Sequence, residues 1–412
     1  MIRKNVRIGL NRSIFAAEQS PSWPWVLWFA LCLIPFSLPG GYSANYLIAL
    51  TPVFWLLAGG KIYYPPSIIS LFILLCLVVF FVASVYQVDQ LDNGFRRIIS
   101  FILFMASFSL VFIPVDFRIR NAFCFALILI ACFYSAIAIY KYFAFGLAGA
   151  AADAKGAVGT QRLGFLYIVA FWILVDYLIR GGVASKLRYL AVLVTSILIL
   201  VGIIFTFSRA SYVALTASFL IFPFFYRSKI ALLRFSTFFR LAGVILVVLF
   251  GFSVLAIQFP AILGFIEARL IDPAFSGEMY YYATDPGTSE GRRIAIWSEI
   301  LDYVIANPVT GSGFLGIYFV GDSGGSAHSQ YFDVLLRLGL IGFFMYFYLN
   351  IKLASFLARQ DKALFVGFCG VLVFGLFHET FKLSQGVVIF AFLVGYYATA
   401  LRGRSSVARS FR

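Results

Sequence analysis

Two ionisable residues, Arg209 and His328, lie beside long apolar runs and are the first candidates for chemistry. Arg209 sits at the edge of one apolar run, and His328 ends the longest polar loop, just before another apolar run. Charge at the edge of a hydrocarbon layer is costly and usually serves a site. A guanidinium offers paired donors to an anionic group, and an imidazole can accept a proton near neutral pH. We therefore expect both residues to be functional.

The composition defines the class of protein that must position them. The chain is 62% hydrophobic and 12% charged, with a mean hydropathy of +0.96. A soluble chain of 412 residues could not bury that much apolar surface. The apolar stretches are continuous and long enough for helices that cross a bilayer. The fold class is therefore predicted to be all-α, a polytopic transmembrane helical protein.

The hydropathy pattern predicts twelve spans. They lie at 22–38, 45–59, 66–87, 98–115, 121–146, 163–179, 188–206, 210–226, 240–259, 331–351, 363–378 and 383–401. With the N-terminus inside, about two thirds of the 32 lysines and arginines fall on the cytoplasmic side. Both termini are then cytoplasmic. The positive charge is dispersed among the loops, so it is a topology signal and gives no reason to expect a nucleic-acid partner.

One external loop, at 260–330, is far longer than the others. It separates an N-terminal bundle of about nine spans, 1–259, from three C-terminal spans and a cytoplasmic tail, 331–412. Apolar residues recur with helical spacing over 291–306, and Asn307-Pro308 should end that helix. A long structured loop is usually functional. We expect it to lie over the mouth of a cavity in the membrane.

Several polar residues near this mouth have structural as well as functional interpretations. Arg209 could be an interfacial anchor. Asp333 and Arg337 are four residues apart, so an internal pair on one helix face is the preferred interpretation. His378-Glu379 could line the cavity, but an interfacial cap is preferred.

Three motifs, in order along the chain, resemble those of the O-antigen ligase and polymerase superfamily (the WaaL and Wzy proteins). The first is Ser208-Arg209-Ala210. The second runs from Gly291-Arg292-Arg293 through Trp297 and Asn307-Pro308 to Gly311-Ser312-Gly313-Phe314. The third is His328-Ser329, followed by nine residues, Gly339, two residues and Gly342. Arg162-Leu163-Gly164 is a weaker match.

The resemblance implies a metal-independent glycosyltransferase of GT-C type, without a cofactor. It implies a glycan donor carried on undecaprenyl diphosphate, and a sugar hydroxyl of a second glycan or of lipid A-core as acceptor. The implied diphosphate ligands are Arg209 and Arg292, with Arg293 and Arg162 as further candidates. His328 would be the acceptor-side base or positioning group. Weaker candidates for contacts with the acceptor or its sugars are Trp297, Tyr281, Arg337 and His378.

Three functions remain open at this stage. A polymerase adds the growing glycan to another lipid-linked unit, with a chain-length regulator as a further partner, whereas a ligase transfers it to lipid A-core. The run from Asn307 to Phe314 looks polymerase-like and gives a slight preference for that activity. A lipid-linked oligosaccharide transporter is the alternative from another class, but the halves of the chain show no repeat that such a transporter should have. The expected location is the bacterial inner membrane, with the site on the periplasmic side.

Overall fold

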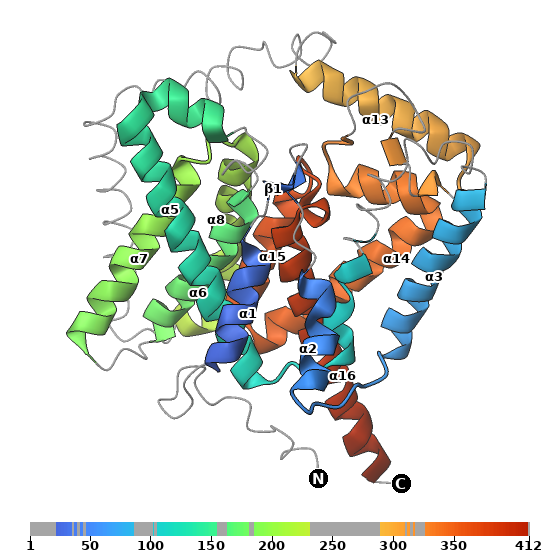
Figure 1. Cartoon of the computed structure of the whole chain (residues 1–412), viewed down its shortest axis with the longest axis horizontal. Coiled ribbons are helices and arrows are strands. Elements are labelled where there is room, and N and C mark those ends of the chain that lie inside the picture. The colour runs from blue at the N-terminus through green and yellow to red at the C-terminus, as the bar shows by residue number, and fades with distance from the viewer. Residues whose placement is uncertain are drawn as a thin grey trace.

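The computed structural model describes most of the chain and is built of helices, with one short strand pair among the described residues (Figure 1). The described residues are 22–34, 37–38, 42–43, 47–85, 102, 105–154, 163–180, 185–230, 289–309, 311–313, 316–317 and 326–410. In chain order, the elements are α1 (Trp23–Leu33), β1 (Ser37–Leu38), β2 (Tyr42–Ser43), η1 (Leu47–Leu50), α2 (Thr51–Leu57), α3 (Ser67–Val85), η3 (Ser109–Phe112), α5 (Phe117–Ala154), α6 (Gly164–Arg180), α7 (Lys186–Ile204), α8 (Arg209–Ile230), α13 (Ser289–Ala306), α14 (Gln330–Gln360), α15 (Lys362–Phe374), η7 (Thr380–Lys382) and α16 (Ser384–Ser410). The strands β1 and β2 pair antiparallel.

Long apolar helices confirm a multi-pass helical membrane protein. Within the described part of the chain, five helices are long and apolar enough to cross a bilayer: Phe117–Gly146, Lys186–Ile204, Arg209–Tyr226, Gln330–Gln360 and Ser384–Gly403. Shorter apolar helices include α1, α6 and α15. Among the twelve predicted spans, 240–259 lies outside the described residues and 98–115 is described in part. The number of spans therefore stays a prediction.

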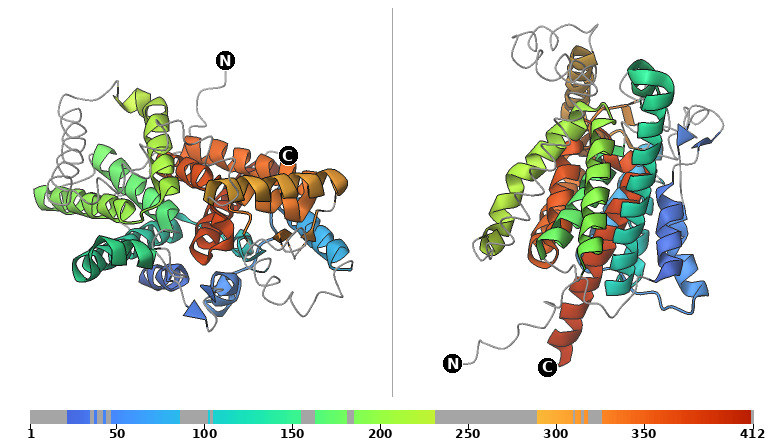
Figure 2. Two further views of the ribbon diagram at one scale, coloured as in Figure 1. Left: turned by 90° about the horizontal axis from the view of Figure 1, so that it is seen from above. Right: turned by 90° about the vertical axis from the view of Figure 1, so that its left-hand side faces the viewer.

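The centre of the bundle is made by α6 and α15. Almost every side chain of α6 from Phe165 to Val175 is buried, as expected for a helix that is apolar on all sides. Close packing depends on small residues of α15, because a Cβ added to Gly367 would lie 3.0 Å from the Val169 Cα. Helices α5, α7 and α8 pack around this pair, and α16 lies beside it (Figure 2).

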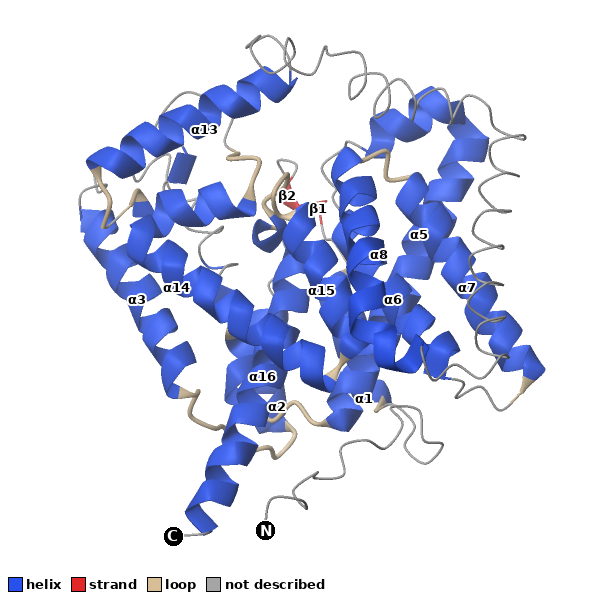
Figure 3. Ribbon diagram, turned by 180° about the vertical axis from the view of Figure 1, so that it is seen from behind, coloured by secondary structure: helices blue, strands red, loops and turns tan. Residues whose placement is uncertain are grey.

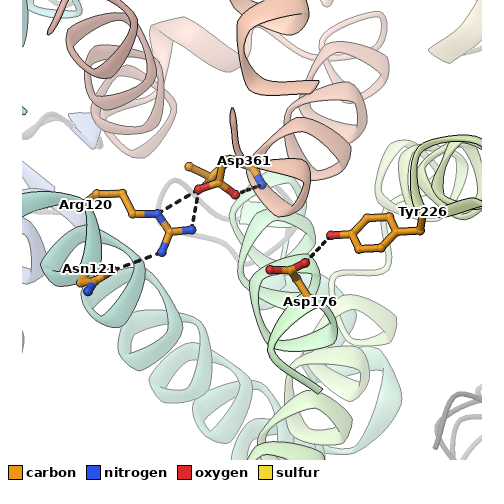
Figure 4. Close-up of polar contacts among 6 residues, drawn as sticks. Arg120, Asn121, Asp176, Tyr226 and Asp361 are labelled. Carbon is orange, nitrogen blue, oxygen red and sulfur yellow. Dashed lines mark hydrogen bonds and ion pairs between the residues drawn. The ribbon is translucent and has the colours of Figure 1, made fainter. Parts of the chain in front are cut away.

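Two buried polar pairs join helix ends on one side of the bundle (Figure 4). Arg120, at the start of α5, donates from Nε and Nη2 to Asp361 Oδ2, at 2.9 and 2.5 Å. Asp361 precedes α15, and both residues are almost fully buried. Tyr226, late in α8, donates to Asp176 Oδ1, late in α6, at 2.7 Å. The start of α6, the start of α8 and the end of α15 therefore meet at the opposite end.

Helix α14 contains the span predicted at 331–351 but is longer and is interrupted by a break. It begins at Gln330 and breaks at Gly339, where φ is 63° and ψ is −171°. The break leaves room for a neighbouring turn, because a Cβ on Gly339 would lie 2.4 Å from the Val309 carbonyl oxygen. The segment from Gln330 to Leu338 therefore runs beneath α13 before the helix changes direction (Figure 3).

Candidate functional site

His328 lies directly before α14 in a backbone conformation that is uncommon for a side chain of its size. Its φ is 51°, in the left-handed region, and its side chain is half-buried. The His328 N–H donates to Ser326 Oγ at 3.2 Å. Ala327, the residue before it, is held at both of its backbone polar groups. Ala327 N–H donates to Glu379 Oε1 at 2.5 Å, and the Ala327 carbonyl accepts from Trp297 Nε1 at 2.8 Å.

The connection between α15 and α16 holds the residues that follow His328. Gln330 N–H donates to the carbonyls of Gly375 and His378, at 2.8 and 3.1 Å. In return, Phe381 N–H donates to Gln330 Oε1 at 2.7 Å. The His378 ring stacks on Phe374, with centroids 4.8 Å apart. His378 and Glu379, predicted as a polar pair at a span end, thus lie against the His328 segment.

Arg209 is the first residue of α8, and its side chain is exposed. Phe207, two residues earlier, also has a positive φ, 50°. Ser208 occupies the position that usually caps a helix through its hydroxyl. Its buried Oγ instead has no hydrogen-bond partner in the described structure. The first turn of α8 carries no acidic residue. The positive charge of the guanidinium therefore adds to the positive end of the helix dipole at the start of α8.

Packing contacts bring the Arg209 end and the His328 end of the bundle together. A Cβ on Gly164, the first residue of α6, would lie 2.0 Å from Ser211 Oγ and 2.9 Å from Phe374 Cε2. The first turn of α6 is therefore wedged between the first turn of α8 and the last turn of α15. Because Phe374 stacks on His378, the chain of contacts from Ser211 leads directly to the segment that holds His328.

Helix α13 lies across the same end of the molecule and packs on the first part of α14 (Figure 2). Its buried residues Ile296, Ile300 and Val304 cluster with Ala327 and Leu336. The Trp297 ring is half-buried and stacks on Phe332, with centroids 4.9 Å apart. The helix predicted over 291–306 is thus present, with a start two residues earlier.

The two adjacent arginines of α13 lie in different surroundings. Arg292 is exposed and Arg293 is half-buried. Residues four apart share a helix face, so Arg293 lies on the side of Trp297 and the loop before His328. Adjacent residues on a helix are separated by about 100°. Arg292 is therefore turned away from that side.

The glycine-rich turn after α13 interlocks with α14. Ser312 N–H donates to the Leu336 carbonyl at 2.6 Å, and Leu340 N–H donates to the Pro308 carbonyl at 2.8 Å. Tyr303 donates from its hydroxyl to the Gly311 carbonyl, and burial raises the pKa of Tyr303 and keeps this donor protonated. The second motif, which covers α13 and its glycine-rich turn, is therefore in direct backbone contact with the third motif, which contains His328 and Gly339.

Arg337 makes the internal pair that its spacing predicts. Its Nε donates to Asp333 Oδ1 at 2.9 Å, and both side chains are almost fully buried. The guanidinium also lies against the turn, because a Cβ on Gly316 would approach Arg337 Nη2 to 2.7 Å. This pair packs the glycine-rich turn onto α14.

Two predicted site residues, Arg162 and Tyr281, lie outside the described residues. In the described part of the chain, no group of three or more His, Cys, Asp and Glu side chains is gathered as for a metal ion. The sequence did not indicate the roles of Glu379 and Gln330. The one feature of the sequence that could have pointed to these two residues is that they are polar and lie at the ends of apolar runs.

Comparison with known proteins places the centre of this site in one family. Residues 194–347 match the family model described as O-antigen ligase. The match contains Arg209, helix α13, His328 and the glycines of the α14 break. No curated protein matches the chain. Over residues 194–347 the chain thus matches the O-antigen ligase family, which supports the O-antigen ligase/polymerase superfamily that the motifs indicated.

Proposed function

We propose that this protein transfers a glycan from undecaprenyl diphosphate to a sugar hydroxyl at the periplasmic face of the bacterial inner membrane. The family domain supports a role in surface-polysaccharide assembly. The finer assignment rests on the meeting of Arg209, α13 and His328 at one end of the bundle. We also propose that the enzyme is of GT-C type, with twelve spans, and needs neither a metal ion nor a cofactor.

The observation that carries the proposal is the position of Arg209 at the start of α8. The guanidinium and the positive end of the helix dipole both favour the binding of an anion at this point. An exposed guanidinium, a helix N-terminus and an N-cap serine that does not cap the helix together suit a phosphate group. A diphosphate gains negative charge when its bond to the sugar breaks, so fixed donors at this point would stabilise the transition state.

Arg293 is the second proposed diphosphate ligand. It lies on the face of α13 that packs toward the His328 loop, whereas Arg292 is exposed. A second guanidinium at this end of the bundle would bind the diphosphate together with Arg209. We therefore assign Arg293 in preference to Arg292, and keep Arg162 as a further candidate.

His328 would act on the acceptor. The acceptor hydroxyl oxygen attacks the anomeric carbon, the bond from that carbon to the diphosphate oxygen breaks, and the hydroxyl proton passes to the imidazole. The electron pair of the broken bond stays on undecaprenyl diphosphate. Phe332 stacks on one face of the Trp297 ring, so only the other face is left for an acceptor sugar. Arg337 is engaged by Asp333 and has a weaker claim to such a contact.

The orientation is proposed from charge and from the two ends of the bundle. We place Arg120, Asp176 and Asp361, which belong to the two buried polar pairs at the end opposite to His328, at the inner rim of the membrane. In intact spheroplasts of a variant without its five cysteines, an impermeant thiol reagent should label Ser323→Cys. Gly403→Cys, at the other end of α16, should be labelled after lysis. The reverse pattern would contradict the proposal.

A transfer assay with purified protein tests the activity. The lipid-linked glycan donor is offered either to a second lipid-linked glycan or to lipid A-core, with a chelator present. Transfer to the first acceptor indicates a polymerase, which we slightly prefer, and would justify a search for a chain-length regulator as partner. Transfer to the second indicates a ligase. Absence of transfer to both acceptors by folded protein would contradict the proposed reaction.

A further inference from the structure

We propose that Glu379 is a positioning residue, which holds the backbone N–H of Ala327, the residue before His328, and thereby aims the imidazole at the acceptor. Glu379 lies 51 residues after His328, outside the segment that matches the family model. The effect on catalysis rests on the proposed function, in which His328 handles the acceptor hydroxyl. The effect on the backbone does not.

Ala327, the residue before His328, is held at both of its backbone polar groups. Glu379 accepts the Ala327 N–H, and Trp297 donates to the Ala327 carbonyl. These two partners come from different elements, the connection after α15 and the helix α13. The Ala327 methyl group is also buried in the cluster with Ile296 and Ile300. The position of Ala327 is therefore fixed through its N–H, its carbonyl and its methyl group.

The backbone at His328 needs such support. A positive φ of 51° is uncommon for a residue with a Cβ, and it persists where the surroundings determine it. On the C-terminal side, Gln330 is held by the carbonyls of Gly375 and His378. On the N-terminal side, Glu379 holds Ala327. The short connection between α15 and α16 thus grips His328 on both sides.

The proposed role makes a specific demand on the side chain at 379. The contact needs an acceptor oxygen at the end of a three-carbon chain, and Gln keeps that oxygen. Ala removes it, and Asp shortens the chain by one methylene. A positioning role therefore predicts that Glu379→Gln keeps most of the activity and Glu379→Ala loses it. A group that itself gave or took a proton would be lost in both variants.

Two measurements on the purified full-length protein test the proposal. Hydrogen exchange of a peptide that covers 326–332 reports the backbone around His328 without any substrate. Steady-state transfer reports kcat and the KM for the donor. Glu299→Ala, on the exposed face of α13, removes a carboxylate at the same end of the molecule and is the matched control.

The expected result is faster exchange over 326–332 in Glu379→Ala, with kcat lowered roughly 10- to 100-fold and the donor KM little changed. Glu379→Gln and Glu299→Ala should resemble the parent protein in both measurements. Unchanged exchange in Glu379→Ala would overturn the proposal, as would equal loss of kcat in the Ala and Gln variants. If exchange rises in Glu379→Ala while His328→Ala keeps full activity, the positioning contact stands and the proposed function of His328 fails.

Discussion

The backbone of Gly339 lies against the carbonyl of Val309, so closely that a Cβ on Gly339 would come within 2.4 Å of that oxygen. Gly339 belongs to the histidine motif, and Val309 to the turn that follows α13. Their contact joins two motifs that are separate in the sequence. It lets the first part of α14, which begins two residues after His328, run beneath α13.

Gly339→Ala should therefore destabilise the protein. The new methyl group would collide with the turn, and the positive φ would be strained. We expect a loss of about 2 kcal/mol or more in the free energy of unfolding. Thermal unfolding in detergent measures it. Gly403→Ala, which meets no atom within 4 Å, is the control and should match the parent protein. Equal melting of the two variants would contradict the close contact.

Arg209→Ala should lower the rate of transfer by about 10²–10³-fold, the scale for loss of one fixed donor in a site of developing charge. Arg209→Lys should restore part of the rate, because it keeps the charge but loses the paired donors. Initial rates at saturating and limiting donor separate the effects on kcat and KM. A fully active Arg209→Ala protein, present at normal level in the membrane, would remove Arg209 from the site.

The adjacent arginines of α13 should differ in their effect. Arg293 is half-buried on the side of Trp297, and Arg292 is exposed. Arg293→Ala should therefore raise the donor KM, or lower kcat, more than Arg292→Ala does. Both proteins should melt within a few degrees of the parent. A larger defect in Arg292→Ala would reverse the assignment and make Arg292 the diphosphate ligand.

His328→Ala should lower transfer by about 10²–10⁴-fold, as expected when a general base is removed. Binding of the lipid-linked donor should remain, because the arginines are intact. Binding of a labelled donor and turnover are measured on the same preparation, with and without a chelator. Unchanged turnover in the variant would make His328 structural. Loss of parent activity on addition of the chelator would instead contradict the metal-independent mechanism.

The buried pair at the other end of the bundle should matter for stability. Asp361→Leu leaves Arg120 buried without its carboxylate and removes the acceptor of the Leu364 N–H. We expect about 3–5 kcal/mol of destabilisation from the stranded charge. The double variant Arg120→Leu with Asp361→Leu should recover a large part of that loss. Chemical denaturation compares the proteins, and a double variant no more stable than the single one would show that the ion pair is not the cause.

The sequence by itself was sufficient for the class of protein and for the family resemblance, and it supplied the candidate site residues. Apolar runs of helix length reveal membrane helices because hydropathy and periodicity are local properties. The motifs around Arg209, α13 and His328 were recognisable because their residues lie close together in the chain. Even the pair of Asp333 and Arg337 followed from their spacing of one helical turn.

Only the tertiary structure decided what holds His328 and which residues share its end of the bundle. The hydrogen bond from Ala327 to Glu379 spans 52 residues, and the ion pair of Arg120 and Asp361 spans 241. Such contacts depend on how helices pack, and no local pattern in the sequence records that. The break at Gly339 is of the same kind, since the helical pattern continues through it. Residue 339 must be glycine because the carbonyl of Val309 occupies the space that a Cβ would fill.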